Sequence, residues 1–211
     1  MSVEFPASPG DIQRTRRRSR WRRFLRWVIV PGIAGVLLTL RPGVGPREDP
    51  LPMPYPYIPS PNYDDRPEGV TVNCVVLHAT VEPTVQGTIN IFLDPAKRVS
   101  AHFIVGKEGQ VIQMVPVEKR AWHAGPSELD GKPAVNDYSV GIEMVNRNDG
   151  VDPYPEVQMQ AVAGIIRFVR SRYVIPDERI VSHATVARPA GRKTDPRNFD
   201  LDRLRRLARI P

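Results

Sequence analysis

The stretch VNCVVLH, residues 72–78, is the part of the sequence that decides the fold. Its apolar and β-branched residues predict a buried strand over Val72–Leu77, and His78 follows at the carboxyl end. A second run, VGIEMV at 140–145, predicts another strand within 138–145 and carries Glu143 in its middle. Because predicted helices alternate with such strands along the chain, the sequence indicates an α/β domain built on one sheet.

The remaining elements follow from the spacing of apolar residues and from turn residues on either side of these strands. We expect helices over 85–93 and 156–173, and a hairpin of 101–105 with 111–115 that turns at Gly109. Beyond the second helix we expect a short strand at 180–181, a loop over 184–199, and a final helix over 201–209 capped by Asp200.

The charge of the 211-residue chain is concentrated at one end. The net charge is +7, but residues 1–47 hold ten arginines against Glu4 and Asp11, while the rest holds 20 basic and 21 acidic side chains. A nearly neutral body argues against a nucleic-acid-binding domain. The single cysteine, Cys74, excludes an intrachain disulfide framework and a multi-cysteine metal site.

The N-terminal segment, residues 1–41, has the pattern of a signal peptide or membrane anchor. The arginine-rich stretch RTRRRSRWRRFLR at 14–26 precedes the uncharged run WVIVPGIAGVLLTL at 27–40. A basic region before an apolar run is typical of export signals, and 14 residues are short for a spanning helix. We therefore expect export to the cell envelope with the arginines in the cytoplasm. A basic arm that touches anionic lipid or nucleic acid is the alternative.

A proline-rich linker is predicted over residues 42–69. Nine prolines fall within 42–67, which excludes a helix or a central strand there and favours a semi-rigid, extended spacer. The globular domain is accordingly expected over 70–211, set off from the membrane by this spacer.

Two histidines and an aspartate are placed where they could meet. His78 and His183 each follow a predicted buried strand, and the carboxyl ends of such strands are where open α/β sheets place their sites. Asp195 lies in the loop after His183. Two histidines and one carboxylate suffice for a catalytic zinc that keeps a position for water. Histidines that only make structural hydrogen bonds are the alternative.

Glu143 is unusual because it sits inside an apolar strand. Strand alternation places its side chain on the other face of the strand from Ile142 and Met144. Burial there would raise the pKa of its carboxyl, as a general base near neutral pH requires. An edge strand or a salt bridge would explain it without catalysis. Lys193 precedes Asp195 by two residues and would stabilise an oxyanion beside a metal. Trp122 and His123, before a flexible Ala-Gly, are candidates to line a groove.

Five motifs occur in a fixed order across the domain. They are VLHAT at 76–80, VSAHFIV at 99–105, AWHAG at 121–125, NDYSVGIE at 136–143, and SH at 182–183 with GRKTDP at 191–196. Together they resemble the zinc-dependent N-acetylmuramoyl-L-alanine amidases of type 2, which are related to peptidoglycan recognition proteins. The resemblance covers about residues 70–210.

This resemblance implies a single mixed β-sheet flanked by helices and one zinc ion per chain. The implied zinc ligands are His78, His183 and Asp195. Glu143 would be the general base and Lys193 the oxyanion stabiliser, and the residues implied to bind substrate are Trp122, His123 and Asn136. The implied reaction is hydrolysis of the amide bond between N-acetylmuramic acid and L-alanine in peptidoglycan or muropeptides, for cell-wall turnover or remodelling.

Three other functions deserve comparison with this one. A membrane-tethered module that binds peptidoglycan without cleaving it would not need three ligands together with Glu143 and Lys193. A scaffold domain leaves Glu143 unexplained. An iron oxygenase is disfavoured because the sequence lacks the close His-x-Asp pair usual in such sites. No partner protein follows from the sequence, and no nucleic acid is expected.

Overall fold

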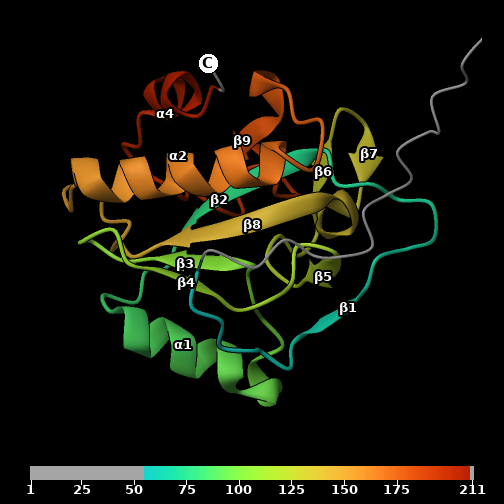
Figure 1. Cartoon of the computed structure of the whole chain (residues 1–211), viewed down its shortest axis with the longest axis horizontal. Coiled ribbons are helices and arrows are strands. Elements are labelled where there is room, and N and C mark those ends of the chain that lie inside the picture. Colours follow the sequence, from blue (N-terminus) through green and yellow to red (C-terminus); the bar gives the residue numbers. More distant parts are fainter. Residues whose placement is uncertain (1–54, 210–211) are drawn as a thin grey trace, which may run out of the picture. The chain divides into compact units, whose positions relative to one another are not determined.

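A computed structural model describes residues 55–209, and within them a mixed five-stranded sheet is flanked by helices (Figure 1). The predicted signal or anchor segment, 1–41, and the linker up to residue 54 lie outside the described residues. Between residues 55 and 209, the structure contains no helix with the length and apolarity needed to cross a membrane.

The helices and strands of the described residues have the following bounds. The strands are β1 (Tyr63–Asp65), β2 (Cys74–Ala79), β3 (Phe103–Val105), β4 (Val111–Gln113), β5 (Lys119–Ala121), β6 (Glu128–Leu129), β7 (Lys132–Pro133), β8 (Ser139–Met144) and β9 (Ile180–Ser182). The α-helices are α1 (Val85–Leu93), α2 (Glu156–Arg170), α3 (His183–Val186) and α4 (Leu201–Leu207). Three short 3₁₀ helices cover Pro95–Lys97, Val135–Tyr138 and Asp177–Arg179.

The central sheet has the strand order β4-β3-β8-β2-β9. The strands β3, β8, β2 and β9 run parallel, and β4 returns antiparallel to β3 as the predicted hairpin. Gly109 has a φ of +80° in that turn, a conformation that glycine adopts at little cost. The expectation of a mixed central sheet is therefore confirmed, although the described residues also form two two-stranded sheets, β1-β5 and β6-β7.

Helices cover both faces of the sheet (Figure 1). The largest core cluster joins one face of the sheet to α2 and α4, through side chains such as Leu77, Ile142, Val162 and Leu204. A smaller cluster joins the other face to α1 through Ile89 and other residues. Side chains on this second face include His78 and Glu143, which alternate with the core residues before and after them.

The helix α2 is shorter than predicted and buries a polar residue. It ends at Arg170 rather than at residue 173. Its apolar stripe packs on the sheet as expected, although Val157 is half exposed. Gln158 is buried instead, because its Nε2 donates to the carbonyls of Val105 and Val145 at 3.0 and 3.1 Å. These carbonyls lie where β3 and β8 end, and that of Val105 also accepts the amide of Val145 at 2.8 Å, so Gln158 ties α2 to the ends of both strands.

Two further differences from the expected boundaries bear on the site. The strand β2 runs through Ala79, so His78 is inside the strand rather than beyond it. The expected loop over 184–199 begins with the short helix α3, whose N-cap is Ser182. The Ser182 side chain accepts a hydrogen bond from the amide of Thr185 at 3.1 Å, which explains why a helical turn forms there.

The expectation that residues 42–69 form a spacer is wrong for 55–69, which pack on the domain. Tyr55 lies edge-on against Phe103 and Phe168. Residues 56–60 run beside β4, and β1 pairs antiparallel with β5. Prolines are compatible with such edge positions because an edge strand leaves alternate backbone groups unpaired. The globular domain therefore includes these residues.

Arg66 fastens this segment to the domain. Its guanidinium donates to four backbone carbonyls at 2.8–3.1 Å, which belong to Val117, Asn136, Asp137 and Ser139. Its Nη2 also lies 3.2 Å from Nε2 of His102, whose Nδ1 accepts the amide of Gly141. The segment before residue 70 thus supports the loop and strand that lead into β8.

Candidate active site

Four of the residues singled out in the sequence, His78, Glu143, His183 and Asp195, meet at the carboxyl end of the parallel strands. His78 on β2 and Glu143 on β8 are partners in the strand register. His183 begins α3 immediately after β9, the strand on the other side of β2. Asp195 comes from the following loop, which is tied to α3 because the amide of Ala184 donates to the Asp195 carbonyl at 3.0 Å.

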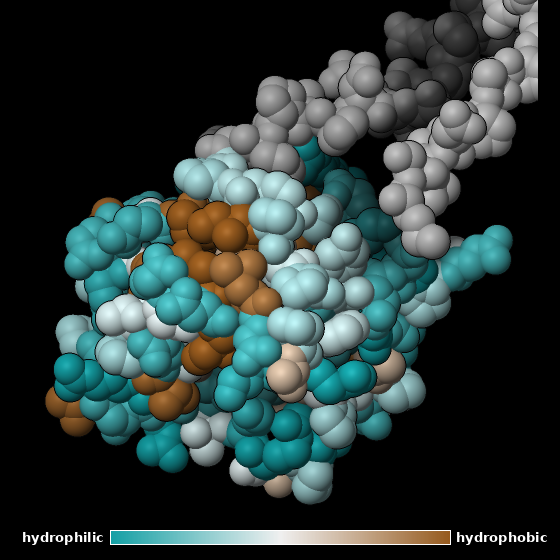
Figure 2. All heavy atoms as spheres, turned by 90° about the horizontal axis from the view of Figure 1, so that it is seen from below, coloured by the Kyte–Doolittle hydropathy of each residue, from teal (hydrophilic) through white to brown (hydrophobic). Residues whose placement is uncertain are grey.

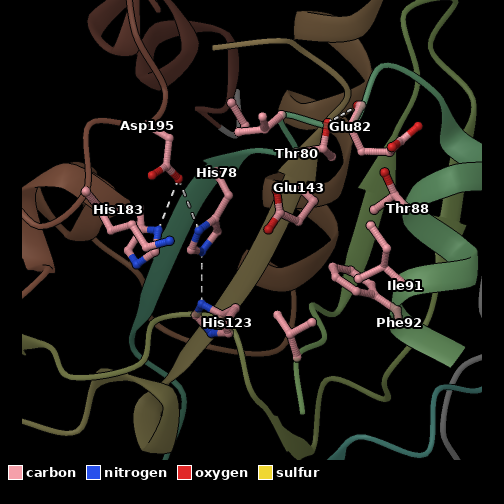
Figure 3. Close-up of a pocket in the computed structure, with 14 residues that line it drawn as sticks. His78, Thr80, Glu82, Thr88, Ile91, Phe92, His123, Glu143, His183 and Asp195 are labelled. Atoms are coloured by element: carbon pink, nitrogen blue, oxygen red, sulfur yellow. Dashed lines mark hydrogen bonds and ion pairs between the residues drawn. The ribbon is translucent and has the colours of Figure 1, made fainter. Parts of the chain in front are cut away.

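His78, His183 and Asp195 form a compact, buried group that could hold a metal ion. One ligand atom from each lies within 4.8 Å of the others. Asp195 Oδ2 is 3.1 Å from Nδ1 of His183 and 3.5 Å from Nδ1 of His78 (Figure 3). Burial lowers the pKa of His78 to about 4.

The nitrogen and oxygen atoms of this group are suitable ligands for a zinc ion. Nε2 of His183 lies 3.2 Å from the carbonyl oxygen of Ala124, which can only accept a hydrogen bond. With Nδ1 bound to a metal ion, His183 would carry its proton on Nε2 and donate it to that carbonyl. Imidazole nitrogen and carboxylate oxygen are ligands that zinc prefers, and a cation between them relieves the repulsion of facing acceptors.

Glu143 and Lys193 line the same cavity, which has a volume of about 210 Å³. Burial raises the pKa of Glu143 to about 8, with a further contribution from the charge of Asp195. Its Oε2 is buried and has no hydrogen-bond partner among residues 55–209. A half-buried carboxyl with an unpartnered oxygen in a cavity is a typical general base.

The three residues predicted to bind substrate separate into two places. His123 lines the cavity beside His78 (Figure 3). Trp122 and Asn136 instead border a neighbouring depression with Asp64, Arg98 and Arg120. Asn136 is buried, and its Oδ1 accepts the amides of His123 and Ala124 at 3.3 and 2.8 Å. Asn136 therefore holds the chain around His123, and whether it contacts substrate stays a prediction.

The outer wall of the cavity comes from α1 and the segment before it, none of which the sequence analysis assigned to the site. It includes Val81, Thr88, Ile91 and Phe92, as well as Glu82. Seen from the α1 side, the surface carries a patch of hydrophobic side chains within an otherwise hydrophilic face (Figure 2). An apolar wall opposite a polar cluster is typical of small-molecule sites.

Arg192 is another residue that the sequence analysis missed. Its Nη2 donates to the carbonyls of Ala124 and Pro126 at 2.9 and 2.8 Å, and its Nε donates to Arg188. It thereby fixes the carbonyl that orients His183. Its position beside Lys193 in an arginine-rich chain gave no signal that would distinguish it from solvated arginines.

Comparisons with known proteins agree with this site. Residues 68–198 match the family N-acetylmuramoyl-L-alanine amidase. The 1,6-anhydro-N-acetylmuramyl-L-alanine amidase AmpD of Escherichia coli is 35% identical over 170 residues, which cover 71% of this chain and 90% of the relative.

Solved structures show the same relationship. A selenomethionine derivative of AmpD superposes with a TM-score of 0.65 at 31% identity, covering 74% of this chain and 94% of the other. The E. coli amidase AmiD, solved with anhydro-N-acetylmuramic acid-L-Ala-D-gamma-Glu-L-Lys, gives a TM-score of 0.58 at 29% identity, covering 67% and 60%.

A half-buried carboxyl beside a His-His-Asp group, on a mixed sheet that enzymes of known structure share, defines a hydrolase. Within that class, the chain belongs to the N-acetylmuramoyl-L-alanine amidase family.

Proposed function

We propose that this chain hydrolyses the amide bond between N-acetylmuramic acid and L-alanine in peptidoglycan or muropeptides, with one zinc ion held by His78, His183 and Asp195. The observation that carries the proposal is the arrangement of those three residues beside Glu143. Glu143 and the three residues with converging ligand atoms line one cavity.

The relatives support muropeptides as the substrate class. AmpD is named for the 1,6-anhydro-N-acetylmuramyl-L-alanine amide, and AmiD was solved with an anhydro-muramyl tripeptide. Such a ligand has an apolar lactyl group next to a polar peptide. The cavity offers Ile91 and Phe92 on one wall and charged groups on the other, which suits both halves.

A zinc ion at this site would supply Lewis-acid polarisation of the scissile carbonyl and would lower the pKa of a water. Glu143 accepts a proton from the attacking water, since a carboxyl whose pKa is near 8 is a competent base and acid around neutral pH. It then delivers that proton to the nitrogen of L-alanine as the C–N bond breaks. Lys193 lines the same cavity, where its ammonium would stabilise negative charge on the former carbonyl oxygen.

We further propose that the enzyme acts outside the cytoplasm. Support comes from the arginine-rich segment and apolar run of residues 1–41, followed by prolines that would space the domain from a membrane. Fractionation of cells that express the full chain tests this proposal. Recovery in the envelope fraction is expected, and recovery in the cytosol would overturn it.

The main experiment joins metal content to cleavage. The full chain is purified, zinc is measured by elemental analysis, and anhydro-muropeptide and intact peptidoglycan are each offered with and without a chelator. We expect one zinc per chain and chelator-sensitive release of peptides with a new L-alanine amino terminus. Asp195→Ala should lose zinc and activity, whereas the matched variant Asp202→Ala, on the exposed side of α4, should keep both. Retention on peptidoglycan without release would favour a recognition module instead.

A further inference from the structure

We propose that His123 is a positioning residue that, together with Ser139, fixes the tautomer of His78 and so turns the correct ring nitrogen toward the metal site. This inference rests on the proposed function and deepens it. It gives His123 a role different from the substrate contact that the sequence resemblance implied.

A backbone carbonyl fixes the direction of the first hydrogen bond in this chain of contacts. Ser139 Oγ lies 2.6 Å from the carbonyl oxygen of Val135 and 3.1 Å from Nε2 of His123. The carbonyl can only accept, so the single hydroxyl proton of Ser139 belongs to that short contact. The Ser139 oxygen must then accept a hydrogen bond from His123, which places a proton on His123 Nε2.

The direction of this hydrogen bond determines the direction of the hydrogen bond between His123 and His78. A ring whose single N–H proton is on Nε2 has a bare Nδ1. That Nδ1 lies 3.0 Å from Nε2 of His78 (Figure 3). His78 therefore donates from Nε2, and its Nδ1 carries the lone pair that faces Asp195.

His183 also presents Nδ1 to the metal site, but a different group fixes its tautomer. The carbonyl of Ala124 accepts from His183 Nε2, and Arg192 holds that carbonyl in place. Both candidate ligands are thus presented through Nδ1, one by a backbone oxygen and the other by a histidine and serine relay. Partners behind ligating histidines fix ring orientation and raise affinity for metal in general.

The surroundings of His123 are built to hold its ring. Gly141 lies directly behind it, and a Cβ at that position would be 2.5 Å from Cγ of His123. Asn136 holds the backbone of His123 and Ala124. A ring that is 6% exposed and pressed against backbone contributes little surface to a substrate.

The first test is zinc affinity, measured on the full chain by competition with a chelator of known affinity. His123→Ala should weaken zinc binding by about 10–100-fold, with KM for muropeptide unchanged at saturating zinc. His123→Asn should bind zinc within about threefold of the wild type, because its Oδ1 can accept from His78 in place of Nδ1. The neighbouring Trp122→Phe should leave zinc affinity unchanged. Unchanged affinity with a raised KM in His123→Ala would overturn the proposal.

The second test observes the tautomer itself. Nitrogen-15 spectra of the histidine rings should show protonated Nε2 and unprotonated Nδ1 for His78 in the wild type. Ser139→Ala, a milder change, should alter the His123 signals and weaken zinc binding by several-fold, which covers the case that His123→Ala does not fold. A protonated Nδ1 on His78 would refute the relay. If the wild type binds zinc with this tautomer but cleaves no muropeptide, the proposed function fails and the positioning role stands.

Discussion

His78 and Glu143 are register partners on the adjacent parallel strands β2 and β8. Their side chains emerge on the same face, so the pairing of the two strands alone sets the distance between the candidate metal ligand and the candidate base. A slip of one residue would send one of them into the core beneath α2. The catalytic geometry is therefore fixed by a part of the protein that is buried and paired along its whole length.

Replacement of Glu143 by glutamine should abolish proton transfer while leaving the metal site intact. We expect kcat to fall by about 10²–10⁴-fold, which is the usual contribution of a general base. Zinc content should stay at the wild-type level, because Glu143 is not one of the three clustered ligands. Turnover close to that of the wild type would contradict the role assigned to Glu143.

A stability measurement on metal-free protein separates this loss from misfolding. Since burial raises the pKa of Glu143 to about 8 from 4.5, the folded state binds a proton that the unfolded state releases between these values. Its contribution to stability is thus lost progressively as the pH rises from about 4.5 to about 8. The neutral glutamine should make the chelated variant more stable than the wild type at pH 9, by about 1 kcal/mol or roughly 2–4 °C in Tm.

Acid should unfold the metal-free protein through its buried histidines. Burial lowers the pKa of His78 to about 4 and that of His102 to about 3 from 6.5, and it also lowers the pKa of His123. Between pH 6.5 and 4 the unfolded chain therefore binds more protons. The free energy of unfolding should fall in this window by about 1.4 kcal/mol per pH unit for each histidine. Urea titrations of chelated protein across the window measure the slope, and a flat profile would contradict it.

Loss of Arg66 should destabilise the domain far more than loss of a surface arginine. Arg66→Ala would leave four carbonyls without their charged donor, and we expect a cost of about 3 kcal/mol or more. Arg203, which pairs with Glu156 where both side chains are about half exposed, is the matched control. Arg203→Ala should cost less than about 1 kcal/mol. Equal losses of unfolding free energy in urea would show that the attachment of residues 55–69 through Arg66 adds no more to stability than a surface ion pair.

Sequence periodicity was sufficient to predict the sheet and the main helices, because these elements follow from local patterns. The run around Cys74 is apolar on both faces, as a central parallel strand must be, and the helix α1 has the predicted bounds. His78, Glu143, His183 and Asp195 could be chosen because polar groups in or after buried strands are costly without a purpose.

The residues that position those side chains could not be identified from the sequence. Ser139 and Gly141 look like ordinary strand residues, and their roles depend on the register that brings His123 against them. Residues 55–69 look like a spacer because proline composition describes local conformation and not the edge strand that the segment meets. Arg66 donates hydrogen bonds to carbonyls about 50 to 70 positions away in the sequence, so no local sequence pattern predicts its role.

A methyl group at position 141 should test how tightly the ring of His123 is held. In Gly141→Ala the new Cβ would lie 2.5 Å from Cγ and 2.7 Å from Cδ2 of His123, so the ring must move away from His78 or the strand must yield. We expect a loss of about 1–3 kcal/mol in unfolding free energy, measured with urea on chelated protein, together with weaker zinc binding. Gly164→Ala is the matched control, because the nearest atom to its Cβ would be Tyr55 Oη at 3.7 Å in an α2 that favours alanine. The control should keep its zinc affinity and gain about 0.5–1 kcal/mol. If both variants bind zinc equally well, the close packing of Gly141 on His123 has no bearing on the metal site.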